Sequence, residues 1–246
     1  MEIAAGLAGL LSVLVSCFVG VRLVLLARRT GHSPELLIGL DLILVGGAWN
    51  ALIAVGRQAT GLPDELRAAL VCAGALSAVA GTACLMLFTW QTFRPSRAGA
   101  LTAIVLGLLL AGLFTAQSIT TGWLAFATDE RGPWTNASLF TSINYVWACF
   151  ESMRHASMLS RRVRLGLADP VVADRVRLFA TLMATGTLAS WMFAGFQAVG
   201  IAVGGTTVGL SFGAAVCLFS VALLWLAFMP PASYLESVRR RAVVEA

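Results

Sequence analysis

Seven long apolar stretches divide this chain and fix what it can fold into. An α-helix needs about 20 apolar residues to cross the hydrocarbon core of a bilayer. The stretches that meet this length cover residues 3–27, 35–56, 67–91, 99–120, 136–158, 175–200 and 206–229. With 59% hydrophobic and 12% charged residues, the chain is far from the composition of an ordinary soluble domain. The sequence therefore predicts an all-α polytopic membrane protein, a single seven-transmembrane-helix bundle over residues 1–246.

The arginines predict how this bundle is oriented. All 17 residues counted as lysine or arginine are arginines. Threading the seven stretches in order places most of them on one side: Arg22, Arg28, Arg29, Arg94, Arg97, Arg154, Arg161, Arg162, Arg164, Arg175, Arg177, Arg239, Arg240 and Arg241. Only Arg57, Arg67 and Arg131 fall on the other side. Because positive loops stay in the cytoplasm, we expect the N-terminus outside and the C-terminus inside.

The same composition bears on partners and location. The arginines fringe helix ends and form no single patch, so the net charge of +5 indicates contact with the lipid bilayer and not with nucleic acid. Arginine without lysine, in a chain rich in Ala, Gly and Leu, is typical of a GC-rich bacterial genome. We therefore expect a multi-pass protein of the bacterial inner membrane.

Proline marks where several helices begin or end. Pro230-Pro231 ends the seventh stretch, and residues 232–246 then predict a short interfacial helix on the cytoplasmic leaflet. Ser33-Pro34 and Asp169-Pro170 each combine a side-chain acceptor with a proline at the first helical position, so we expect both pairs to cap helices.

The two halves of the chain share a pattern that predicts an internal repeat. Cys17-Phe18 and Cys149-Phe150 are 132 residues apart, as are Arg22 and Arg154. The third and seventh stretches end alike, in Trp90-x-x-Phe93-x-Pro95 and Trp225-x-x-Phe228-x-Pro230. These matches predict a 3+1+3 arrangement, in which two parallel three-helix units flank a linking fourth helix.

A seven-helix, outside-to-inside chain with 3+1+3 halves and a tail helix resembles the transporter–opsin–receptor superfamily. That grouping includes microbial rhodopsins, 3+1+3 sugar carriers and G-protein-coupled receptors. Pro231-Ala-Ser-Tyr234 is similar to the signature of receptor helix 7, although Pro230 stands where that signature has asparagine. The resemblance covers nearly the whole chain at the level of architecture, and it implies either signalling or transport.

Charged side chains inside predicted spans are candidate functional residues because they are costly in a bilayer. Arg22 and Asp41 lie at similar depths in neighbouring antiparallel helices, so we expect an ion pair between them. That pair would be structural or act as a switch; otherwise, Arg22 snorkels and Asp41 meets water at the interface.

The fifth stretch holds the other concentration of polar groups. Asn144, Glu151 and His155 fall on one helix face, with Arg154 one turn from Glu151. A carboxyl about 15 Å deep is either neutral or paired, and we expect Arg154 or His155 as its partner. A satisfied pair would hold the bundle together, whereas a titrating Glu151 would couple protons.

The outer half offers a candidate ligand site. Aromatic and amide side chains there suit a small amphipathic ligand, although Trp near a membrane surface also serves as an anchor. The residues are Trp49, Asn50, Gln117, Trp191 and Gln197.

Two basic segments are candidate docking sites. Arg161, Arg162 and Arg164 sit in the longest inner connection, and Arg239, Arg240 and Arg241 in the tail. Either segment can bind a cytoplasmic signalling protein or rest on anionic lipid.

Several function classes are disfavoured by what the sequence lacks. It contains no H-E-x-x-H or G-x-S-x-G motif, so we expect no enzyme. No metal or cofactor is expected, and without lysine the chain cannot hold retinal as a Schiff base. The sequence favours a receptor-like sensor that signals to a separate cytoplasmic partner. The alternative is a 3+1+3 carrier for small solutes or lipids, with proton coupling through Asp41 and Glu151.

Overall fold

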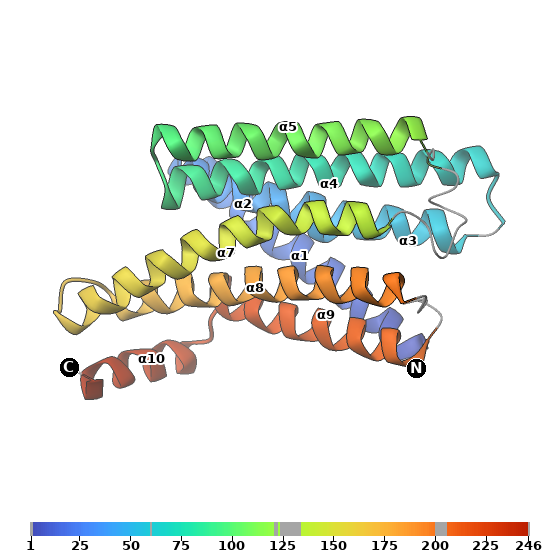
Figure 1. The fold of residues 1–246 in the computed structure, drawn as a ribbon. Coiled ribbons are helices and arrows are strands. Elements are labelled where there is room, and N and C mark those ends of the chain that lie inside the picture. The colour runs from blue at the N-terminus through green and yellow to red at the C-terminus, as the bar shows by residue number, and fades with distance from the viewer. Residues whose placement is uncertain (1, 60, 121–122, 124–133, 200–205, 246) are drawn as a thin grey trace.

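The computed structural model describes residues 2–59, 61–120, 123, 134–199 and 206–245, and its ordered elements are helices (Figure 1). They are α1 (Glu2–Thr30), α2 (Ser33–Asp41), the π-helix η1 (Leu42–Trp49), α3 (Asn50–Gln58), α4 (Asp64–Phe93), α5 (Arg97–Thr120), α7 (Trp134–Arg164), α8 (Pro170–Ala198), α9 (Thr207–Phe228) and α10 (Ala232–Glu245). No strand occurs in these ranges, so the prediction of an all-α fold is confirmed there.

Six helical segments are long and apolar enough to cross a membrane, within the part of the chain that the structure describes. They are Ile3–Thr30, Ser33–Gln58, Asp64–Phe93, Arg97–Ala116, Pro170–Phe196 and Thr207–Phe228. Each coincides with one of the predicted stretches. The second combines α2, η1 and α3, which follow one another without a break. The remaining predicted stretch, 136–158, lies within α7, whose second half carries several polar and charged residues.

The long helices form a closed ring. Going round it, α1 packs against α2 and η1, these against α4, α4 against α7, α7 against α8, α8 against α9, and α9 against α1. Helix α5 packs against α4 and α7 and lies at the edge of the bundle (Figure 1). A core cluster of Ile38, Leu85, Ala148, Phe179 and Met183 joins α2, α4, α7 and α8.

Small residues bring α1 very close to α2 and η1. A Cβ atom at Gly20 would lie 2.7 Å from the carbonyl oxygen of Gly39, and one at Gly39 would lie 2.9 Å from the carbonyl oxygen of Gly20. Farther along the same contact, a Cβ atom at Gly46 would lie 2.6 Å from Ser16 Cβ. The backbones can approach this closely only because these positions lack side chains, which is the usual way that membrane helices pack.

Local signals set several helix ends, as the sequence predicts. The backbone N–H of Val171 donates to Asp169 Oδ1 at 2.9 Å, so the predicted cap of α8 is confirmed. The expectation for Ser33 is wrong: α2 has no side-chain cap, and the Ser33 hydroxyl donates to Gln91 Oε1 of α4 at 2.8 Å. Gly31 and Gly166 follow α1 and α7 with φ of 73° and 68°, a left-handed conformation that glycine adopts without strain.

The two ends of the bundle differ in the helix turns and the arginines that lie there. Figure 1 shows the α4–α5 turn, the α7–α8 turn and α10 together at one end, whereas α1 begins at the other. Arg94, Arg97 and Arg161–Arg164 therefore gather at the same end as the tail helix.

Candidate functional site

An ion pair between α4 and α7 forms the centre of the candidate site. Helix α4 ends at Phe93, and Arg94 leaves the helix with φ of −141°. The Arg94 side chain reaches α7, and Arg94 Nη1 lies 2.6 Å from Glu151 Oε1. The Glu151 side chain is 3% exposed and that of Arg94 is 40% exposed. The pair therefore has one end inside the bundle and one end at its surface.

A cavity of about 340 Å³ opens beside this pair. Its lining consists of Phe93, Arg94, Pro95, Ser96, Glu151, Arg154, His155 and Met158. The rings of Phe93 and His155 lie 5.5 Å apart and form one wall. Because Arg94 neutralises Glu151, the exposed guanidinium of Arg154 leaves the cavity with an excess of positive charge. Such a lining suits a carboxylate or phosphate group.

The sequence indicates that Glu151 needs a partner, but the partner we expect is wrong. Neither Arg154 nor His155 forms an ion pair with it among the described residues, and Arg94 takes that role from another helix. Arg154 is exposed. No sequence pattern connects Arg94 with Glu151, since their contact depends on which helices are neighbours.

Asn144 lies away from this cavity. Its side chain is 3% exposed, and its Oδ1 atom has no hydrogen-bond partner. It borders a small gap against Leu106, Leu110 and Leu113 of α5. The residues predicted to share one face of this helix therefore have different neighbours in the structure: Asn144 faces α5, whereas Glu151 faces the end of α4.

The predicted ion pair between Arg22 and Asp41 is absent from the described residues. The guanidinium of Arg22 instead contacts Met229 Sδ, just after α9. The Asp41 side chain is 5% exposed, and its Oδ1 atom has no hydrogen-bond partner. Depth along the helices brings the two residues level, but their side chains point to different neighbours.

Three of the residues expected to bind a ligand each contact a different part of the bundle. Asn50 Nδ2 donates to the carbonyl oxygens of Val45 and Gly46 at 2.9 and 3.2 Å, so it serves the backbone of η1. Trp49 packs on the cluster of Ile53 and Val71, between α3 and α4. Trp191 Nε1 donates to Ser142 Oγ at 3.0 Å, which joins α8 to α7. The side chains of Gln117 and Gln197 lie outside the described residues.

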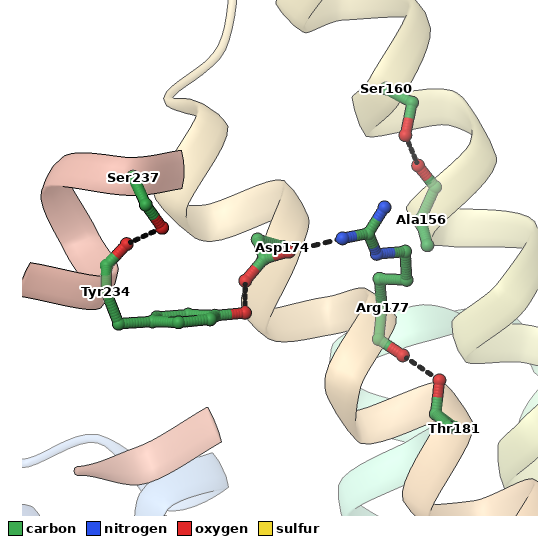
Figure 2. A network of polar contacts seen from close by, with 7 residues as sticks. All are labelled: Ala156, Ser160, Asp174, Arg177, Thr181, Tyr234 and Ser237. Carbon is green, nitrogen blue, oxygen red and sulfur yellow. Dashed lines mark hydrogen bonds and ion pairs between the residues drawn. The ribbon is translucent and has the colours of Figure 1, made fainter. Parts of the chain in front are cut away.

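The tail helix is tied to the bundle by a contact that the sequence does not reveal. Tyr234 Oη donates to Asp174 Oδ2 at 2.6 Å, and Arg177 Nη2 lies 2.7 Å from Asp174 Oδ1 (Figure 2). Asp174 is 8% exposed, and Val238 of α10 is buried at 9%. Helix α10 packs against α8 and α7, so at least one of its faces is covered by protein.

The predicted docking arginines are placed at the surface where the structure describes them. Arg161, Arg162 and Arg164 are exposed in the last turn of α7. Arg239 is also exposed on α10, and Arg240 forms a surface pair with Glu236 at 3.4 Å. The side chain of Arg241 lies outside the described residues.

The Tyr234–Asp174 hydrogen bond yields a first prediction. Replacing Tyr234 with Phe removes a hydrogen bond to a charged group, worth about 1.5 kcal/mol, while the ring is kept. We expect the amides of α10 to exchange hydrogen about tenfold faster, measured by mass spectrometry on the detergent-solubilised protein. Arg177→Gln is the control, because its exposed guanidinium leaves the Tyr234 contact in place and exchange should barely change. Equal exchange in the Tyr234→Phe variant and the native protein would contradict a docked tail.

Comparisons of this chain with protein-family models, with curated proteins and with solved structures find no match.

Proposed function

We propose that this chain crosses the bacterial inner membrane seven times, with its N-terminus outside and its C-terminus in the cytoplasm. Six apolar helices support this proposal, together with the position of α7 in the ring between α4 and α8. Four polar residues between positions 142 and 152 of α7 face protein, since Ser142, Asn144, Glu151 and Ser152 are all buried. A helix that hides its polar groups against neighbours can cross a bilayer with fewer apolar residues.

We further propose that the bundle is a 3+1+3 repeat, with α5 as the linker. Pairing α1 with α7, α2 with α8, and α4 with α9 makes the contacts round the ring equivalent in the two halves. The helix ends agree as well. Arg94 and Met229 follow α4 and α9 in similar non-helical conformations, with φ of −141° and −133°, and their N–H groups donate to the carbonyl oxygens of Trp90 and Trp225.

The function that this geometry supports best is that of a receptor-like sensor that passes a signal to a separate cytoplasmic protein. The cavity beside Arg94 and Glu151 is the observation that carries this proposal. It opens at the arginine-rich end of the bundle, next to the exposed arginines that end α7. Its positive charge is complementary to an acidic segment, so we propose that an acidic segment of the partner docks there.

A photo-crosslinking experiment tests this proposal. A photoreactive amino acid in place of Met158, an exposed residue that lines the cavity, should form a crosslink to a soluble protein in cells. The same group in place of Leu108, which is 68% exposed on α5, should form none. Replacing Arg161, Arg162 and Arg164 with Gln should reduce the Met158 crosslink at least tenfold if charge steers docking. A Met158 position that yields no protein crosslink would contradict a docked partner.

A carrier for small solutes or lipids is the second candidate, and the buried carboxyl of Asp41 is the observation that favours it. Ionisable groups buried in a membrane bundle mark proton relays as well as structural pairs. In vesicles reconstituted with the protein, proton-coupled flux that Asp41→Asn abolishes would favour the carrier over the sensor.

A further inference from the structure

Asp41 is placed deep among four elements of the ring. It ends α2 and directly precedes η1, and its side chain is 5% exposed. Helices α1 and α4 pack against α2, and Tyr145 of α7 and Cys84 of α4 lie within electrostatic range of the carboxyl group. Asp41 is thus enclosed by protein within a predicted membrane span, in the first half of the segment Ser33–Gln58.

No cation compensates this carboxyl group in the described residues. The nearest candidate on α1, Arg22, directs its guanidinium to Met229. The titratable groups facing Asp41 from α4 and α7 are a thiol and a phenol, which are both uncharged in their ordinary forms. The Oδ1 atom accepts no hydrogen bond. An ionised carboxylate would therefore be buried without a countercharge, which costs several kcal/mol even after the protein relaxes.

The backbone next to Asp41 is also unusual. Helix α2 changes into a π-helix after this residue, and π-helical turns are frequent at functional sites. Two consecutive glycines, Gly46 and Gly47, lie within η1, and the Asn50 side chain bonds to the carbonyl oxygens of Val45 and Gly46. The irregular segment is thus held in place by its own contacts, and it begins where the carboxyl group lies.

From this burial, the missing countercharge and the adjoining π-helix, we infer that Asp41 is a proton-binding site that carries its proton in the folded protein at neutral pH. The step is a simple protonation: the carboxylate takes a proton from a hydronium ion, one O–H bond of hydronium breaks as one forms on the carboxyl group, and a neutral carboxylic acid and a water molecule result. The acid form supplies a hydrogen-bond donor where the carboxylate has none. The inference goes beyond the proposed signalling function and does not depend on a cytoplasmic partner.

Infrared spectroscopy of the full chain in detergent or lipid tests this inference. At neutral pH we expect a carboxylic-acid C=O stretching band that is lost in Asp41→Asn, a substitution that keeps the shape of the side chain. Glu151→Gln is the matched control, because it removes a second buried carboxyl group, and the band should persist in that variant. Circular dichroism of each variant verifies that the helices are retained.

Labelling the native protein with ¹³C at the aspartate carboxyl carbon gives a second readout that needs no substitution. The acid band should shift to lower frequency, as it does for any C=O group of heavier mass, whereas a band from a glutamic acid would stay in place. A neutral-pH spectrum with no acid band, or with an acid band that the aspartate label does not shift, would overturn the inference.

Discussion

Replacing Arg94 with Gln is expected to destabilise the folded protein by about 2 kcal/mol, because it leaves the Glu151 carboxylate buried without a partner. The cost lies below that of a fully buried pair because Arg94 is 40% exposed and water already screens part of the attraction. The reverse change, Glu151→Gln, should cost clearly less, since the remaining guanidinium can turn toward water. Unfolding by denaturant in detergent micelles measures both effects.

The contrast between the two ends of this ion pair is the informative part of the experiment. Arg154→Gln serves as the control, because it removes an exposed guanidinium from the same cavity and should change the free energy of unfolding by less than about 0.5 kcal/mol. The double variant Arg94→Gln/Glu151→Gln should recover much of the loss seen with Arg94→Gln alone. Equal losses for Arg94→Gln and Arg154→Gln would show that the pair contributes nothing to stability.

Adding one methyl group at Gly20 is expected to have an effect of similar size, about 2 kcal/mol of destabilisation, because it overpacks a close helix contact. The new Cβ atom of Gly20→Ala would lie 2.7 Å from the Gly39 carbonyl oxygen and 2.7 Å from Ile43 Cγ1. The first of these atoms belongs to the backbone, so α1 and α2 would have to separate. The measurement is the same unfolding experiment, with the thermal midpoint as a second readout.

The chain offers a matched control for this substitution. A Cβ atom at Gly107, in the apolar helix α5, would meet nothing within 4 Å. Gly107→Ala should therefore leave the protein equally stable or slightly more stable, because alanine favours the helix. If Gly20→Ala behaves like Gly107→Ala, then the α1–α2 contact is looser than described.

Features set by local chemistry could be predicted from the sequence, as the helices and one cap illustrate. Runs of apolar residues specify helices regardless of what lies beside them, and Asp169-Pro170 caps α8 through an adjacent N–H group. The π-helix was not expected. Its signal is weak, since the pair Gly46-Gly47 is equally consistent with close packing in an ordinary helix.

Features that depend on neighbouring helices could not be predicted. Glu151 is recognisable as a buried charge from its position, but its partner Arg94 is 57 residues away and becomes available only because α4 ends beside α7. For Asp41 and Arg22, the sequence predicts an ion pair that the described residues do not form. The reason is that equal depth in the bilayer does not make two side chains face each other. The Tyr234–Asp174 contact spans 60 residues and likewise depends on the folded arrangement.

The two helix ends that contain the Trp-x-x-Phe pattern are each followed by a residue that contacts a neighbouring helix, and these two polar contacts differ in strength. Arg94, which follows α4, forms an ion pair with the buried carboxylate of Glu151 on α7. Met229, which follows α9, contacts the guanidinium of Arg22 on α1 through its thioether sulfur. A thioether is a weak acceptor, whereas a carboxylate forms a strong charge-assisted bond. The contact between α9 and α1 therefore depends mainly on apolar packing, through the cluster of Val19, Leu42 and Leu224, whereas the contact between α4 and α7 adds a charge-assisted bond to its packing.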